Sequence, residues 1–192
     1  MTIDVNLPYS LQQELSKVSD LELPPVHLWQ PERVYPIDLV INDNGDWLYE
    51  GSRINRPRLV RLFSRILRRE ADDYFLVTPV EACQITVNDV PFLGVGLSFA
   101  GEGRQQTISM NTNVGDEVLV SDVNPLTFKV KDEVPMPYVL VRDGLWAKLN
   151  RSSYYSLMAA LIDVDGQLGI WSAGANFPIP EELLVDGFGS LP

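Results

Sequence analysis

The most regular hydrophobic pattern in the chain has a helical period and begins after Pro57. Apolar side chains recur at i, i+3, i+4, i+7 and i+8, which places them on one helical face. These positions are Leu59, Leu62, Phe63, Ile66 and Leu67. Pro57 suits the first helical position, because its missing N–H would be unpaired there anyway. The arginines Arg61, Arg65 and Arg68 form a separate stripe on the same predicted helix.

Shorter runs on both sides of this helix have the composition of β-strands. YPIDLVI predicts a strand that turns at NDNGDW and returns as WLYE, and DDYFLVTP predicts another strand after the helix. Beyond Glu81, short β-rich runs are separated by Gly, Asn, Asp and Pro, which predicts a sheet or a barrel. Near the start, SLQQELSKV predicts a short helix, and an extended proline-rich connector follows it.

One phrase occurs twice in the chain, about a hundred residues apart. Residues 149–162 match residues 54–67 at a constant offset of 95 (149 against 54). The matches that precede the helix are the most distinctive, and they pair Asn55 with Asn150, Arg56 with Arg151, Gly45 with Gly144 and Trp47 with Trp146. Apolar spacing alone would be weak evidence, because many core helices share it. The apolar spacing and the matches before the helix together predict an internal duplication of a turn, strand, helix and strand. We therefore expect two related lobes that face each other.

The predicted fold class is α+β, with three segments. Residues 1–36 hold the N-terminal helix and the proline-rich connector, and residues 37–83 form the first repeat domain, with strands and the arginine-rich helix. Residues 84–192 form a larger, mostly antiparallel β domain that contains one helix, the second repeat and the C-terminal tail. A chain of 192 residues with 45% hydrophobic content can bury a substantial core.

Charge and composition narrow the classes of function. The net charge of −11, from 15 basic and 26 acidic side chains, disfavours non-specific nucleic-acid binding and docking on anionic membranes. Apolar runs are too short to cross a bilayer, and the N-terminus lacks an export signal, so we expect a cytoplasmic location. Seven of the eleven arginines nevertheless fall between Arg53 and Arg69.

The duplicated helix entries are the strongest candidates for a binding site. Arg56 and Arg151 each stand where a helix is predicted to begin, and free backbone N–H groups and the helix dipole favour an anion there. Asn55 and Asn150 would orient these entries. Equally compatible with the sequence is a structural role, in which the Asn-Arg pairs shape the turns and each arginine pairs with a local carboxylate. Trp47 and Trp146 are expected to be core anchors, with base-stacking platforms as the alternative.

The sequence shows no recognised motif of a catalytic, metal or cofactor site, so none is predicted. His27 is the only histidine and Cys83 the only cysteine, so histidine-dependent triads and the usual His/Cys zinc sites have too few residues. GLSFAGEGR lacks both the lysine of a phosphate loop and the glycine spacing of a dinucleotide site, and is predicted to be a hairpin turn. The arginine-rich helix could bind phosphates or an acidic partner, although charged faces usually face water.

Five segments together resemble the bacterial domain-of-unknown-function family 1285: INDNGDWLYEG, INRPRLVRLFSRILRRE, YFLVTPVEACQITVNDVPF, PYVLVRDGLWAKLNRSSYYSL and GIWSAG. The resemblance covers roughly residues 22–180. It implies a duplicated α+β architecture whose second domain is superficially like a pleckstrin-homology barrel. It further implies a ligand cleft where the domains meet, for a nucleotide-like molecule, and a part in bacterial signal transduction. The family provides no established activity.

Three functions follow as hypotheses. The leading one is a non-enzymatic module that holds a small anionic, nucleotide-like ligand between the two domains, with Arg56 and Arg151 contacting its charge. The second is a protein-interaction module without a small ligand. The third is a hydrolase that uses carboxylates and a metal recruited with substrate, and the scarcity of His and Cys places it last.

Overall fold

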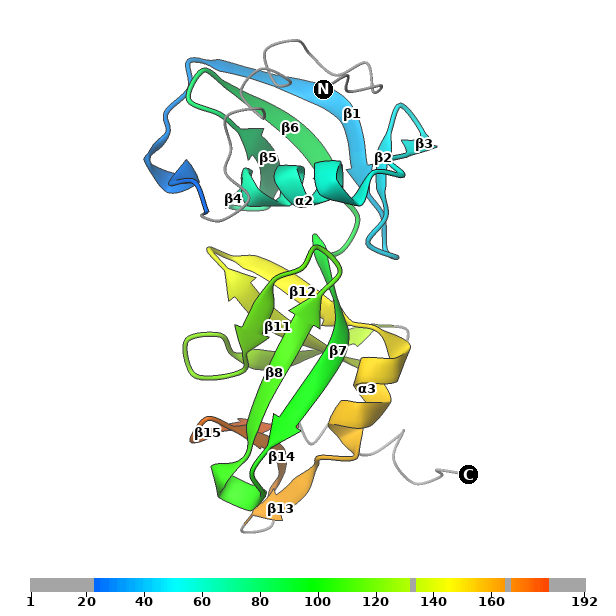
Figure 1. Cartoon of the computed structure of the whole chain (residues 1–192), viewed down its shortest axis with the longest axis vertical. Helices are drawn as coiled ribbons and strands as arrows, with labels where there is room; N and C mark the ends of the chain where they lie inside the picture. Colours follow the sequence, from blue (N-terminus) through cyan, green and yellow to red (C-terminus); the bar gives the residue numbers. More distant parts are fainter. Residues whose placement is uncertain (1–22, 132–133, 165–166, 180–192) are drawn as a thin grey trace. The chain divides into compact units, whose positions relative to one another are not determined.

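The computed structural model describes residues 23–131, 134–164 and 167–179, and the chain divides into two compact units between Pro91 and Phe92 (Figure 1). The predicted boundary at 83/84 falls inside strand β6 (Glu81–Val87). The predicted boundary at 36/37 likewise falls inside β1 (Arg33–Ile41). The helix expected for SLQQELSKV lies outside the described residues. Among those described, no helix is long and apolar enough to cross a membrane.

The first unit is built on a six-stranded sheet with the order β3-β2-β1-β6-β5-β4. Its other strands are β2 (Trp47–Tyr49), β3 (Ser52–Arg53), β4 (Leu67–Glu70) and β5 (Asp73–Val77). Strands β1 and β6 are parallel, and the other neighbours are antiparallel. The sheet is strongly curled, and helix α2 (Pro57–Arg65) lies across one face of it (Figure 1).

The predicted hairpin around NDNGDW is confirmed, since β1 and β2 pair antiparallel. Its turn is held by Asn42, whose side-chain oxygen accepts hydrogen bonds from the N–H groups of Asn44 and Asp46, each at 3.0 Å. Gly45 has a φ of 71°, which is the left-handed conformation that glycine adopts most readily. The side-chain oxygen of Asn42 and the flexibility of Gly45 therefore explain why this short polar segment reverses the chain.

The predicted helix from Pro57 forms, but it is shorter than its apolar pattern indicated. It ends at Arg65, Ile66 is the C-cap, and Leu67 already belongs to strand β4. The carbonyl of Ile66 accepts a hydrogen bond from the N–H of Val77 at 2.9 Å, so pairing with β5 competes successfully with another helical turn. The apolar residues at the end of the pattern are buried in both conformations, which is why periodicity could not distinguish them.

Because α2 ends at Arg65, the three arginines of the predicted stripe lie in different environments. Arg61 is exposed on α2, Arg65 is buried at the end of α2, and Arg68 lies in β4. The guanidinium of Arg68 donates to the carbonyl oxygens of Val26 and Trp29, at 3.0 and 2.8 Å. These bonds fix the proline-rich connector, which contains the short 3-10 helix η1 (Val26–Leu28) instead of being extended throughout.

The second unit contains a six-stranded sheet of order β10-β11-β12-β7-β8-β9 and a three-stranded sheet β13-β14-β15. The strands are β7 (Phe92–Ala100), β8 (Thr107–Thr112), β9 (Glu117–Leu119), β10 (Leu126–Lys131), β11 (Val134–Arg142), β12 (Leu145–Leu149), β13 (Ile162–Val164), β14 (Gln167–Ser172) and β15 (Ala175–Pro178). Only β12 and β7 are parallel in these described sheets. Helix α3 (Arg151–Met158) packs on β7.

The two turns expected in the second unit are present. The segment after β7 forms a short connection with the 3-10 helix η2 (Gly103–Gln105) and leads back into β8, as predicted for GLSFAGEGR. Asp143 and Gly144 join β11 to β12 and both have positive φ, of 41° and 74°. A two-residue turn in which both residues have positive φ twists in the same sense as the strands that it joins.

The chain is thus a two-domain, mostly β protein with few helices. Each unit contains a hairpin, then a helix, then a second hairpin, as β1-β2, α2 and β4-β5 in the first and β11-β12, α3 and β13-β14 in the second. The internal duplication and the pleckstrin-like barrel stay predictions, because the sheets differ in strand order and in the position of their parallel pair.

Candidate functional site

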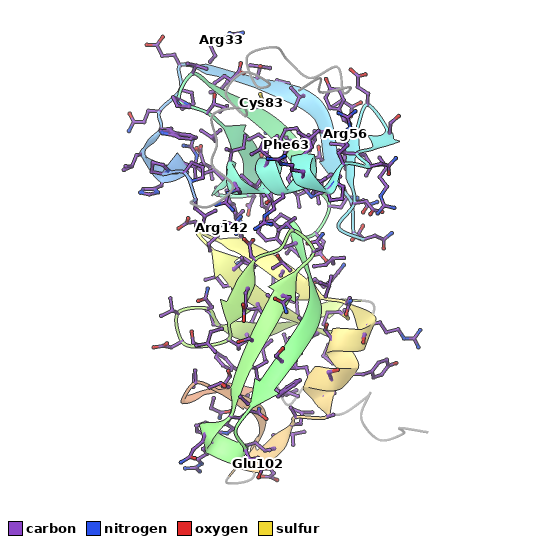
Figure 2. The ribbon with its side chains drawn as sticks, in the orientation of Figure 1. Arg33, Arg56, Phe63, Cys83, Glu102 and Arg142 are labelled. Atoms are coloured by element: carbon purple, nitrogen blue, oxygen red, sulfur yellow. The ribbon has the colours of Figure 1, made fainter. Side chains whose placement is uncertain are left out.

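The entry to α2 is basic and exposed. Arg56 is the N-cap residue, in an extended conformation with φ −111° and ψ 97°, and its side chain does not cap the helix. The first turn of α2 contains no acidic residue, and Arg58 follows two residues later. Acidic side chains are the usual stabilising partners of a helix N-terminus. This entry instead combines the positive end of the helix dipole with arginine side chains (Figure 2).

The entry to α3 has a different cap. Asn150 is the N-cap residue, and its side-chain oxygen accepts a hydrogen bond from the N–H of Ser153 at 2.8 Å. Arg151 follows as the first helical residue and is exposed, with its guanidinium carbon 5.7 Å from the ring centre of Tyr155. The first turn of α3 also contains no acidic residue. This hydrogen bond supports the expectation that Asn150 orients its helix entry.

The Asn-Arg pairs are not in the same structural register. The N-cap is the arginine of the first pair, Arg56, but the asparagine of the second pair, Asn150. Asn55 therefore stands one residue before its helix, is exposed, and does not cap it. Arg56 belongs to the first unit and Arg151 to the second, so each entry is described by itself.

The duplicated tryptophans also differ in environment. Trp47 is 1% exposed and stacks on Phe63 of α2, with ring centres 6.0 Å apart (Figure 2 labels Phe63). Trp146 is only partly buried, whereas its strand neighbours Leu145 and Ala147 are 1% and 0% exposed. Successive side chains of a strand point to opposite faces. Trp146 thus lies on the less buried face of β12 and differs from the expected core anchor.

Sequence reasoning missed a polar group on β1 and β6 of the first unit. Glu81 is 0% exposed, and one of its carboxylate oxygens accepts a hydrogen bond from the hydroxyl of Tyr35 at 2.7 Å. Burial raises the pKa of Tyr35 well above its usual range, and the Cys83 thiol and the Glu81 carboxylate raise it further. Arg33 adds a positive charge, with its guanidinium carbon 5.7 Å from the Tyr35 ring centre. Figure 2 labels Arg33 and Cys83.

Cys83 belongs to this polar group but lacks the features of a nucleophile. It is 0% exposed, and burial raises the pKa of its thiol, while a hydrogen bond with Tyr35 lowers it by a smaller amount. A raised pKa leaves the thiol protonated near neutrality, whereas reactive cysteines are partly exposed and have depressed pKa values. In the described part of the chain, no three His, Cys, Asp or Glu side chains are grouped so as to hold a metal ion.

A signal for Glu81 exists in the sequence. Glu81, Cys83 and Ile85 alternate along β6 and therefore share one face, and all three are buried. A carboxylate at the first position of an otherwise apolar face is unusual, because burying a charge is costly unless it is paired. The alternation was visible in EACQITV, but the depth of burial depends on the neighbouring strands and could not be read from one strand.

Comparison with known proteins gives the chain a family. The family model for the DUF1285 N-terminal domain, described as a domain of unknown function, matches residues 24–90, and that for the DUF1285 C-terminal domain, described as a protein of unknown function, matches residues 91–179. The chain belongs to the DUF1285 family. The family assignment made from the five segments is thereby confirmed. The junction between the two models agrees with the division between the two units.

Two solved structures of DUF1285 family proteins are similar to this chain. One, from Silicibacter pomeroyi DSS-3, is 43% identical, covers 88% of this chain and 93% of its own, and superposes with a TM-score of 0.82. The other, from Shewanella baltica OS155, is 33% identical, covers 63% of this chain and 90% of its own, and has a TM-score of 0.51. No curated protein matches the chain.

Proposed function

We propose that this DUF1285 protein is a non-enzymatic module that binds a small anionic ligand, with nucleotides as the first class to test. The observation that carries the proposal is the entry to α2, where Arg56 is the N-cap, Arg58 follows, and no acidic residue stands in the first turn. The overall charge is −11, so such a basic helix entry is an exception in an acidic protein.

Physical chemistry explains why this entry suits an anion. In α2, Pro57 has no N–H and the N–H of Leu59 already donates to the carbonyl of Arg56 at 3.0 Å. The attraction for an anion therefore comes from the partial positive charge at the N-terminal end of the helix dipole and from the arginines. Arginine adds a planar group that binds phosphate or carboxylate oxygens in pairs. Arg151 gives the second unit a related entry, but there Asn150 already occupies the N–H of Ser153. The proposal therefore assigns the main site to the entry of α2, where Arg58 adds a second arginine, and a separate, weaker site to Arg151 in the second unit.

The ligand proposal predicts a loss of binding when Arg56 becomes alanine. Thermal unfolding of the wild type should be measured with nucleotides, dinucleotides and sugar phosphates. A ligand at about 100 times its dissociation constant should stabilise the protein by roughly 2.7 kcal/mol, or about 5 to 11 °C at this size. We expect this shift to disappear in Arg56→Ala and to decrease in Arg151→Ala.

The matched control is Arg104→Ala, which removes the same charge. Arg104 lies in η2 of the second unit, with its guanidinium carbon 5.2 Å from the Trp171 ring centre, and is part of neither helix entry. A ligand shift that survives in Arg104→Ala but not in Arg56→Ala supports the assignment. If the ligand-induced rise in Tm decreases equally in Arg56→Ala, Arg151→Ala and Arg104→Ala, then net charge, and not the helix entry, attracts the ligand. Unchanged affinity in Arg56→Ala would refute the site.

A protein partner is the second candidate, and exposed apolar side chains favour it. In the first unit Leu28, Val34 and Val80 are 68%, 61% and 50% exposed. Val34 pairs with Ala82, two residues after Val80 in the chain, so two of the three lie near one another. Tagged protein should then capture one stoichiometric partner from a bacterial lysate, and Val34→Glu should lose it. If Val34→Glu retains the same partner, this surface is not the interface.

A further inference from the structure

An ion pair joins the turn between β1 and β2 to β3, just before α2 begins. Nη2 of Arg53, the last residue of β3, lies 2.7 Å from Oδ1 of Asp46, the residue before β2. The side chain of Arg53 is 65% exposed and that of Asp46 is 26% exposed. Exposed ion pairs contribute little to stability, because water screens the attraction and both side chains lose freedom. Arg53 can therefore exchange Asp46 for another anion at small cost.

Arg53 also lies close to the entry of α2. It stands three residues before Arg56 in the chain, so the two Cα atoms are at most about 11 Å apart. Ile54 donates its N–H to the carbonyl of Trp47 at 2.8 Å, and Trp47 stacks on Phe63 of α2. These contacts hold β2 and the segment after β3 beside the helix (Figure 1). Two arginine side chains that start so close together are long enough to contact the same small anion.

The main chain holds Asp46 in place without the help of its carboxylate. The N–H of Asp46 donates to Oδ1 of Asn42 at 3.0 Å, and its carbonyl accepts the N–H of Asn42, also at 3.0 Å. The turn therefore does not need the ion pair in order to form. The carboxylate stays beside Arg53 and occupies the group that could otherwise bind an incoming anion.

We propose that Arg53 is a third arginine of the anion site at the α2 entry, and that Asp46 competes with the ligand for it. The incoming anion takes Arg53 from Asp46, so the ion pair lowers the affinity of the site. The exchange costs the same for every anion, and Asp46 therefore sets the affinity of the site and not its choice of ligand. This inference rests on the proposed function, because it adds a contact and a competitor to the same site.

The test is calorimetric titration of the full chain with inorganic pyrophosphate at a fixed ionic strength. Asp46→Asn removes the competing charge and keeps the shape of the side chain. It should tighten pyrophosphate binding about two- to fivefold, the factor that corresponds to one exposed ion pair. Because Asp46 acts through Arg53, the same change should have no effect on affinity in an Arg53→Gln background.

Asp72→Asn is the matched control, because it makes the same change of charge in a similar ion pair. Oδ1 of Asp72 lies 3.3 Å from Nη2 of Arg69 in β4, and β4 and β3 are at opposite edges of the sheet. Asp72→Asn should leave the affinity for pyrophosphate unchanged. Equal tightening in Asp46→Asn and Asp72→Asn overturns the proposal, since net charge alone would then explain it. Tightening by Asp46→Asn that persists in the Arg53→Gln background overturns it as well.

Arg56→Ala separates this inference from the proposed function. If Arg56→Ala abolishes pyrophosphate binding but Asp46→Asn has the affinity of the wild type, the helix entry binds anions without Arg53, and only the inference fails. If Arg56→Ala binds as the wild type does, or if neither the wild type nor Asp46→Asn binds pyrophosphate, both fail.

Nuclear magnetic resonance of the wild type gives a second measurement that does not depend on the folding of Asp46→Asn. The Nε–H signal of Arg53, assigned by its loss in Arg53→Gln, should shift when pyrophosphate is added. A signal that stays in place at saturating pyrophosphate contradicts the proposed contact.

Discussion

Replacing Trp47 with alanine should lower the free energy of unfolding of the first unit by about 3–5 kcal/mol. Trp47 is 1% exposed and stacks on Phe63, which is itself 0% exposed. The substitution would remove the transfer energy of a large aromatic side chain and leave a cavity that α2 and the sheet can fill only partly. Chemical denaturation followed by circular dichroism would measure the loss.

Trp146→Ala is the matched comparison, because the repeated phrase places Trp146 opposite Trp47. Trp146 is only partly buried, so its removal should cost clearly less, on the order of 1–2 kcal/mol. The difference tests whether the two copies of the phrase have the same structural role. Equal losses in the two variants would show that Trp146 is also a core anchor, and the distinction drawn between the two environments would be wrong.

Replacing Gly94 with alanine should destabilise the second unit by about 1–3 kcal/mol, the usual cost of overpacking a core. A Cβ at Gly94 would lie 2.4 Å from Cδ2 of Leu149 and 2.6 Å from Sδ of Met110. Both neighbours are buried, at 1% and 0% exposed, and have little room to move. The carbonyl of Gly94 also accepts the N–H of Asn150 at 2.9 Å, so a shift of β7 would disturb the entry to α3.

Gly96→Ala provides the control on the same strand. No heavy atom lies within 4 Å of the Cβ position at Gly96, and neither glycine is among those with positive φ. The change should therefore be neutral, or stabilising by about 0.4–1 kcal/mol through the unfolded chain. Thermal and urea unfolding of both variants would measure the contrast. If Gly94→Ala is as stable as Gly96→Ala, the close packing against Leu149 and Met110 does not constrain the strand.

Much of the fold could be predicted because the signals are local. The hairpin at NDNGDW depends on Asn42 and Gly45, which control the backbone within the turn itself. The start of α2 at Pro57 depends on a single fixed φ and a missing N–H. The β-rich character of the second half follows from the composition of each short run. None of these features needs a distant part of the chain.

The end of α2 could not be predicted in the same way. Ile66 and Leu67 continue the apolar spacing of the helix, but strand β5 lies beside them and its Val77 donates to Ile66. Pairing with β5 supplies hydrogen bonds that another helical turn would otherwise supply. The choice is made by a strand that follows later in the sequence, and periodicity within the helix carries no information about it.

The candidate site residues likewise divide into those that local sequence indicates and those that depend on distant parts of the chain. Arg56 and Arg151 were found from the sequence, because helix entries and their charges are local properties. Glu81 was not found, because its burial and its bond from Tyr35 join residues 46 positions apart. Arg65 was expected on a solvated stripe and is instead buried. An amphipathic pattern gives the direction of a side chain from the helix axis, but not what covers it.

The sequence by itself determined the family, the mostly β character of the second half, the hairpin turns and the basic helix entries, because each depends on residues near one another in the chain. The tertiary structure alone decided where α2 ends and where the two units divide. It also decided which tryptophan is in the core and which charged side chains are buried. These features depend on contacts between distant strands, and the free energy of such contacts is not encoded in any single segment.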